Sequence, residues 1–201
     1  MNKRTKISLN VSIKAALLGV MAFIIMLFEF ILPFVPSFLK LDLSEIPVLI
    51  GGFALGPVAA IGIEFIKIVL NLLFNGTITG GIGELANFII GVSFVVPAAI
   101  IYKRKKNLKH ALLGMGVGVI SMTVFACLAN YFFVLPLYAK LMPMDAIISA
   151  AAGVNKFVTD YNSLVLFVFA PFNLVKGILT SIICLPLYKR LSPILHRGIN
   201  N

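Results

Sequence analysis

The chain has 201 residues, of which 60% are hydrophobic and only 12% are charged, and its formal net charge is +10. A water-soluble domain carries roughly 25% charged residues, so this composition excludes an ordinary soluble protein and indicates one embedded in lipid. The hydrophobic runs are continuous rather than alternating, which favours membrane-spanning helices over a membrane β-barrel. The basic residues flank these runs, so we expect cytoplasmic flanks and no nucleic-acid partner.

The first hydrophobic run predicts a helix over residues 12–35, after a basic N-terminal segment. It has no small-residue cleavage site, so we expect a retained helix rather than a signal peptide. Three more runs are long enough to cross a bilayer, which takes about 20 apolar residues. They predict helices over 82–101, 110–135 and 164–188.

The stretch over 46–74 is harder to interpret because it contains Gly56-Pro57. Proline inside a helix removes a hydrogen bond, so the stretch forms either one long helix or two short ones. The positive-inside rule decides between them, because only a turn at Gly56-Pro57 places the basic cluster over 103–106 on the same side as the N-terminus. Lys189, Arg190 and Arg197 then lie on that side too.

We therefore predict an all-α integral membrane protein: a six-transmembrane-helix bundle, with both termini cytoplasmic, that forms a single membrane domain over 1–201. The two short helices occupy 43–56 and 58–75. On this topology a long outer connection runs from about 136 to 162. Its amphipathic piece, over 144–152, is predicted either to lie at the interface or to fold over the bundle as a lid.

Charged side chains inside a membrane are costly and usually face the bundle interior or a cavity. Glu64 and Lys67 lie three residues apart on one predicted helix, so we expect them to pair. Glu29 is expected to reach the outer interface. Lys176 follows Asn173 by one helical turn, which places an ammonium and an amide on one face near the outer end of the last helix.

Further polar residues lie at a similar predicted depth: Glu84, Asn87, Asn130 and Tyr131. They are predicted either to converge on one outward pocket with Asn173 and Lys176 or to form interhelical hydrogen bonds. Aromatic residues are interleaved with them, namely Phe38, Phe132, Phe133 and Phe172. Such a pocket suits a flat or ring-shaped ligand that is uncharged or weakly polar.

The sequence contains no phosphate-binding loop, zinc-protease motif or serine elbow, so we expect neither an enzyme nor a bound cofactor or metal. Without an ATP-binding loop, active transport must draw on an ion gradient or on a separate ATPase. Cys127 and Cys184 lie inside predicted spans without metal-ligand spacing, and are expected to be packing residues.

The segment Phe38-Leu-Lys-Leu-Asp-Leu-Ser-Glu-Ile-Pro47, followed by Gly51-Gly-Phe-Ala-Leu-Gly-Pro57, resembles the signature of riboflavin-specific substrate-binding subunits (S components) of energy-coupling factor (ECF) vitamin transporters. Later segments are similar to that family in order and spacing, so the resemblance covers nearly the whole chain. These are Gly83-Glu-Leu-Ala-Asn-Phe88, Asn130-Tyr131 with Pro136, and Pro171-Phe-Asn-Leu-Val-Lys-Gly177. The resemblance implies a six-helix bundle in the bacterial cell membrane, with riboflavin held near the outer face under the first outer loop.

The resemblance also implies roles for individual residues. Leu41 and Asp42 in the loop would contact the flavin, and Asn130, Asn173 and Lys176 would hydrogen-bond its ring edge or ribityl hydroxyls. Glu84, Asn87 and Tyr131 are weaker candidates for the same site. The ligand is riboflavin or its phosphate, FMN.

The partners implied are a transmembrane coupling subunit and two ATPases. The family docks through small residues on the first helix, and the best match here is Ala15 with Gly19, while Ser12 and Ala16 form a competing pair. A similar small pair, Gly114 with Gly118, is expected to serve internal packing. An alternative function is a self-sufficient proton-coupled carrier of a small ring-containing substrate, with Glu64 or Glu84 as a proton relay.

Overall fold

The computed structural model describes residues 9–196 apart from 34, 78 and 141, and most of this part is helical. Five of the described helices are long and apolar enough to cross a membrane, and a shorter apolar helix lies among them. The helices are α1 Leu9–Met26, α2 Glu45–Leu55, α3 Pro57–Asn75, α4 Ile82–Arg104, α5 Leu108–Ala129, α6 Leu135–Tyr138, α7 Met144–Ala152, α8 Tyr161–Leu164 and α9 Ala170–His196. Two π-helical turns, η1 Asn130–Val134 and η2 Val165–Phe169, join α5 to α6 and α8 to α9.

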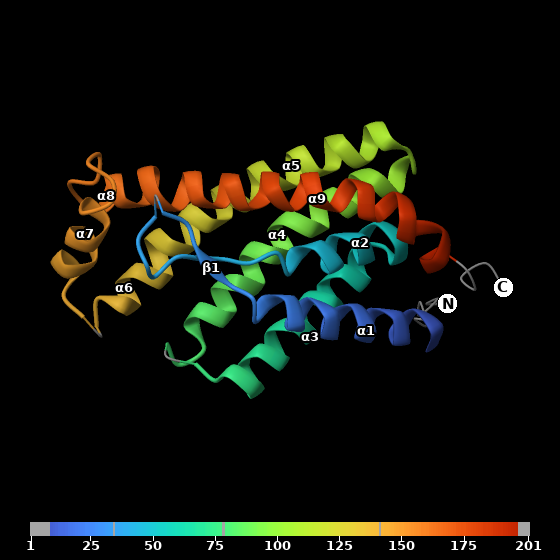
Figure 1. Cartoon of the computed structure of the whole chain (residues 1–201), viewed down its shortest axis with the longest axis horizontal. Coiled ribbons are helices and arrows are strands. Elements are labelled where there is room, and N and C mark those ends of the chain that lie inside the picture. The colour runs from blue at the N-terminus through green and yellow to red at the C-terminus, as the bar shows by residue number, and fades with distance from the viewer. Residues whose placement is uncertain (1–8, 34, 78, 141, 197–201) are drawn as a thin grey trace, which may run out of the picture.

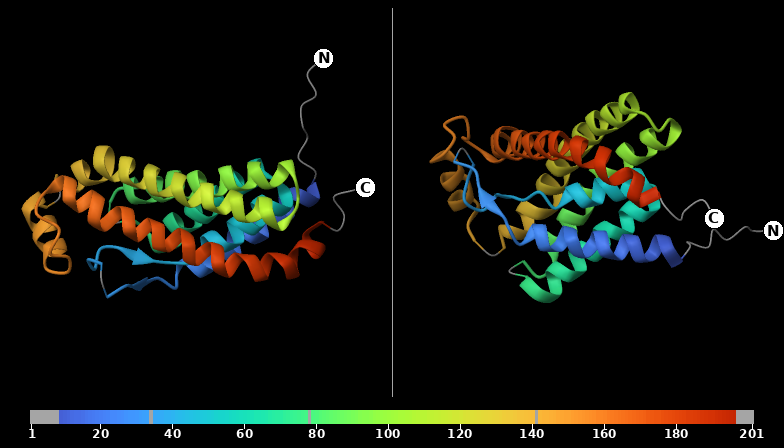
Figure 2. Two further views of the ribbon diagram at one scale, coloured as in Figure 1. Left: turned by 90° about the horizontal axis from the view of Figure 1, so that it is seen from above. Right: turned by 45° about the vertical axis from the view of Figure 1, so that its right-hand side comes forward.

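The long helices lie side by side in an elongated bundle (Figure 1). The start of α1, the turn between α4 and α5, and the end of α9 lie at one end of it. The helices α6, α7 and α8 lie at the opposite end, as Figure 2 shows from two further directions. The basic cluster over 103–106 therefore lies at the end away from α7.

The first helix ends at Met26, which corrects the expected helix over 12–35. The chain instead forms a short antiparallel hairpin, in which β1 Phe30–Ile31 pairs with β2 Lys40–Leu41. Pro33 and Pro36 lie between the two strands and cannot donate to a helical ladder. Pairing across the hairpin gives the backbone of residues 30–31 hydrogen-bond partners that a continued helix would otherwise have supplied.

The break predicted at Gly56-Pro57 is present. Gly56 adopts φ 99°, a conformation that glycine tolerates better than any other residue, and Pro57 occupies the first turn of α3, where its missing N–H costs nothing. The helix α2 has 11 residues, so it is only about 16 Å long at 1.5 Å per residue. All residues from Glu45 to Ala54 are buried, because α1, α3, α4 and α9 surround the helix. Packing inside the bundle accounts for a helix too short to cross the bilayer core by itself.

Close packing between α4 and α5 depends on two glycines. A β-carbon on Gly114 would lie 2.7 Å from the carbonyl oxygen of Ala98, and one on Gly118 would lie 2.5 Å from that of Phe94. Both distances are shorter than a carbon atom allows, so glycine is required for this approach. The predicted packing role of the pair is confirmed. Cys127 and Cys184 are unpaired thiols that pack in apolar clusters, also as predicted.

We expect Gly118→Ala to lower the free energy of unfolding by about 1–3 kcal/mol, because the added methyl overpacks the α4–α5 contact. Gly116→Ala is the matched control, since Gly116 has nothing within 4 Å of the same added atom. Thermal unfolding of both variants in detergent, followed by far-UV circular dichroism, measures the difference. Equal unfolding temperatures would contradict the packing argument.

Candidate ligand-binding site

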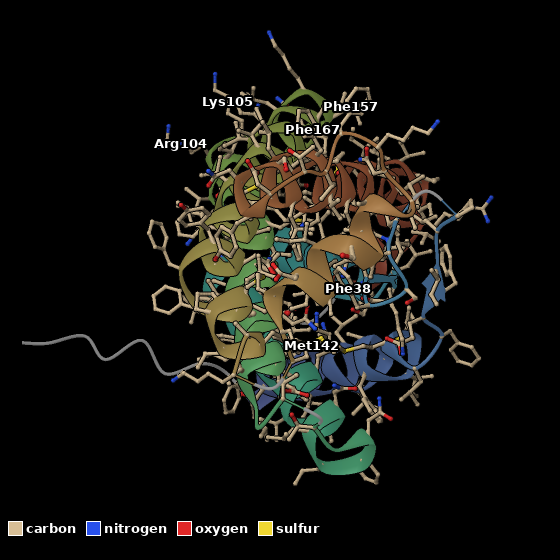
Figure 3. The ribbon with its side chains drawn as sticks, turned by 90° about the vertical axis from the view of Figure 1, so that its left-hand side faces the viewer. Phe38, Arg104, Lys105, Met142, Phe157 and Phe167 are labelled. Atoms are coloured by element: carbon tan, nitrogen blue, oxygen red, sulfur yellow. The ribbon has the colours of Figure 1, made fainter. Side chains whose placement is uncertain are left out.

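A cavity of about 340 Å³ opens among the helices near the end that carries α7. Its volume lies within the range of pockets that hold small molecules. The walls come from the hairpin, α2, α4, α5 with η1 and α6, α7, and α9 with η2. Figure 3 looks onto this end and shows Phe38 and Met142, both in the cavity wall, near the middle of the bundle.

An ion pair joins the loop before α2 to the last helix across this cavity. The Nζ of Lys176 donates to Oδ2 of Asp42 at 2.8 Å, and both side chains are buried and line the cavity. The other oxygen of Asp42 accepts from the backbone N–H of Ser44 at 2.9 Å and from its hydroxyl. Burial opposes ionisation of Asp42, but the Lys176 and Lys67 ammonium groups and these hydrogen bonds hold its pKa well below the ordinary value. Asp42 is therefore an anion, and the loop is fastened to α9.

Two asparagines offer acceptors to the cavity. Nδ2 of Asn130 donates to the carbonyl of Ala126, and Nδ2 of Asn173 donates to the carbonyl of Phe169, each at 2.8 Å. Because the amide nitrogens are turned toward their own helices, the Oδ1 atoms point away from those carbonyls. Asn130 is the first residue of η1, and Asn173 donates to the last residue of η2; such π-helical turns are frequent at functional sites. The arrangement suits a ligand with N–H or O–H donors.

A second buried ionic cluster lies beside the first. The ammonium of Lys67 donates to Oε1 of Glu45 at 2.7 Å, and Oε1 of Glu64 lies at the same distance from it. The predicted Glu64–Lys67 pair is thus confirmed. Glu45 stands in the signature segment over 38–47, but its role is not predictable from the sequence, because spacing within one helix cannot reveal a partner on another. Glu45 also lines the cavity.

The mouth of the cavity is formed by the hairpin and α7. Glu29 and Lys40 form an exposed ion pair across the hairpin, so Glu29 lies at the surface of the bundle. The predicted amphipathic piece is the helix α7, and its buried residue Ile147 contributes to the cavity wall. This contact agrees with the lid rather than with a helix lying apart at the interface.

The structure brings five of the predicted site residues into the cavity wall: Asp42, Asn87, Asn130, Asn173 and Lys176. It does not bring in the other three. Leu41 is buried beneath the wall against Val35 and Phe172. Glu84 accepts hydrogen bonds from Thr77 and Thr79 in the connection before its own helix. The Tyr131 ring packs on Phe132 and Tyr161.

The wall also contains apolar residues that the sequence analysis did not single out: Met26, Met122, Tyr138 and Met142. They come from several elements, and apolar side chains of this kind occur throughout the chain. The expected aromatic set divides in two. Phe38 and Phe172 line the cavity, whereas Phe132 and Phe133 are exposed on the outside of the described bundle.

Long apolar helices around a cavity with a few fixed polar groups define a membrane-embedded protein that binds a small molecule. Residues 10–188 match the family model of the substrate-specific component of ECF transporters, and the chain belongs to this family.

Curated relatives agree with this assignment. The riboflavin transporter RibU of Staphylococcus aureus (strain TCH60) is 34% identical over 98% of this chain and all of that protein. The riboflavin transporter FmnP of Bacillus subtilis (strain 168) is 31% identical over 89% of this chain and 90% of that protein. A solved structure of the S component of a bacterial ECF transporter has a TM-score of 0.71 and 34% identity, and covers 93% of this chain and 98% of that chain.

We expect Lys176→Met to lower the free energy of unfolding by about 3 kcal/mol, because it leaves the buried Asp42 carboxylate without a partner. The double variant Asp42→Leu/Lys176→Met removes both charges and should recover most of that loss. Lys40→Met, which breaks the exposed pair with Glu29, is the control and should cost less than about 1 kcal/mol. Thermal unfolding of the ligand-free proteins in detergent measures all three. A double variant less stable than Lys176→Met would overturn this account of the ion pair.

Proposed function

We propose that this chain captures riboflavin at the outer face of the bacterial cell membrane and delivers it inward as the substrate-binding subunit of an ECF importer. The observation that carries the proposal is the cavity that holds Asp42, Asn130, Asn173 and Lys176 between apolar walls. A flavin has a flat ring with N–H and carbonyl groups and a chain of hydroxyls. These groups match the asparagine acceptors, the Lys176 ammonium and the aromatic walls. The subunit binds and releases its substrate without changing it, so it is not an enzyme.

Within this cavity we assign the polar contacts to four residues. Asn130 and Asn173 accept from ligand donors, while Lys176 donates to a ligand carbonyl or hydroxyl and remains close to Asp42. Asn87 lines the α4 side of the cavity and is a further contact. Leu41 acts from behind Phe172 by shaping the wall, and Glu84 and Tyr131 lie outside the contact set.

The proposed topology has six crossings, with the buried α2 counted as one, and both termini in the cytoplasm. Its support is the gathering of the start of α1, the end of α9 and the basic α4–α5 turn at one end of the bundle. Cytoplasmic flanks are enriched in Lys and Arg. The cavity and α7 then face outward, which is the side from which a vitamin is captured.

The coupling subunit and its two ATPases supply the energy, and the packing of α1 favours one of its two small-residue pairs as the docking face. Gly19 is buried against α3, where a β-carbon would lie 2.6 Å from Cγ2 of Ile66, and Ala15 packs against the core. Neither residue presents a free small-residue surface. Ser12 and Ala16 are exposed on α1, so we place docking on their face.

The proton-coupled carrier has less support. Glu84 is held by threonines outside the cavity wall, and Glu64 is fully buried next to Lys67. Neither is placed on a water-lined path through the described bundle. The relatives named as riboflavin transporters and the ECF family model favour the importer subunit.

The protein purified from flavin-containing medium should be yellow. The fluorescence of riboflavin should be quenched when it binds to the protein. Asn173→Leu removes one acceptor and should weaken riboflavin binding about 10- to 100-fold, the effect of leaving a ligand donor unpaired in a dry site. Glu84→Gln is the matched control outside the wall and should bind normally. Unchanged affinity in Asn173→Leu, or a loss in Glu84→Gln, would refute the assignment of contacts.

Replacing Ala16 with Trp should abolish riboflavin uptake by proteoliposomes that contain the complete ECF module and ATP, because the bulky ring separates α1 from its partner. Riboflavin binding by the isolated subunit should be unchanged. Val117→Trp, on the exposed face of α5, is the control and should retain uptake. Normal uptake by Ala16→Trp would place docking elsewhere.

A further inference from the structure

The buried charges of this protein do not balance. The described part of the chain buries three carboxyl groups, those of Asp42, Glu45 and Glu64, but only two ammonium groups, those of Lys67 and Lys176. Asp42 and Lys176 neutralise each other, so two carboxyls share the single ammonium of Lys67. An uncompensated charge in an apolar interior is so costly that ionisable groups there take up a proton instead.

The contacts identify which carboxyl is in excess. Oε1 of Glu45 accepts the hydrogen bond from Lys67, and Glu45 is the first residue of α2, where the helix dipole stabilises an anion. Glu64 lies in the middle of α3, is completely buried, and has no hydrogen-bond partner for either oxygen within the described chain. Its contact with Lys67 is short but lacks hydrogen-bonding geometry.

The helix α4 packs directly against Glu64. The helix α4 presents Gly91, where a β-carbon would lie 2.3 Å from Oε1 of Glu64 and 2.9 Å from Oε1 of Glu45. The backbone of α4 therefore packs directly against both carboxyls. Asp42 and Lys176, which lie beside this cluster, already form their own ion pair.

We propose that Glu64 is a proton-binding site: it is a neutral carboxylic acid in the folded protein, and its proton keeps the cluster beside the ligand cavity at zero net charge. If Glu64 lost this proton, the Lys67 ammonium would have to neutralise two carboxylates, those of Glu45 and Glu64. Glu45, which lines the cavity, would then carry unbalanced negative charge that competes with Asp42 for Lys176. Ligand binding is thereby linked to the proton on Glu64, although no proton is transported.

The first test is spectroscopic and does not depend on the proposed ligand. Infrared difference spectra between wild-type protein and Glu64→Gln should show the carbonyl stretch of a protonated carboxylic acid in the wild type only. Glu84→Gln is the matched control and should keep the band. Glu64→Gln replaces a neutral acid by a neutral amide of the same shape, so it should fold with unchanged or higher thermal stability. An unfolded Glu64→Gln variant, or a band that persists in it, would overturn the proposal.

The second test rests on the proposed function and uses riboflavin titrations over a range of pH. Wild-type affinity should be constant from acid to neutral pH and fall about tenfold or more at alkaline pH, where Glu64 loses its proton. Glu64→Gln should bind as tightly as the wild type at neutral pH and keep that affinity under alkaline conditions. Ionisation of the flavin itself affects both proteins equally, so the difference between them reports on Glu64. Identical pH profiles would refute the linkage.

The two tests fail separately. If the wild type bound no riboflavin, the proposed function would be wrong, but the infrared band would still establish the proton on Glu64. If riboflavin bound with the same pH profile in both proteins and the band were absent, the proton site would be wrong and the proposed function would stand.

Discussion

The binding end of this protein depends on one ion pair inside a medium that cannot solvate charge. Asp42 stands in the loop before α2 and Lys176 in α9, and their 2.8 Å contact joins segments 134 residues apart. In lipid neither group can be left alone, so the loop can leave α9 only when another polar group replaces it. The same constraint explains why the loop is ordered by Ser44 on one side and anchored to α9 on the other. Both residues of the ion pair line the cavity.

The short helix α2 divides the bundle into two functional parts. It is surrounded by α1, α3, α4 and α9, and its first residue, Glu45, is both a wall of the cavity and a partner of Lys67. On one side, α1 and α3 pack through Gly19 and leave Ser12 and Ala16 exposed, on the face that we propose for docking. On the other side, η1 and α9 carry Asn130 and Asn173. The helix α2 therefore connects the proposed partner face with the ligand cavity, and it is itself largely shielded from lipid.

Much of this arrangement could be predicted from residues whose chemistry is restrictive in a membrane. Buried charges, the Gly56-Pro57 break, the small pair Gly114 and Gly118 and the amphipathic segment over 144–152 each have few physical solutions. Where a segment can adopt several structures, its sequence alone does not show which one forms. The apolar run through residue 35 contains Glu29 and Pro33, but neither residue fixes the end of α1 at Met26. The pairing of Glu45 with Lys67 and the burial of Gly19 depend on neighbours far away in the chain, which periodicity within one helix cannot identify.

The two π-helical turns have a consequence for how such a site can change. Each turn holds about one residue more than an α-helical turn, and Asn130 opens the first while Asn173 donates to the last residue of the second. Deleting one residue from either turn would rotate everything beyond it by about 100° around the helix axis. A single codon lost or gained in these turns would thus present a different set of side chains to the cavity while leaving the lipid-facing composition almost unaltered. Insertions and deletions, and not only substitutions, are in this fold a route to a new ligand.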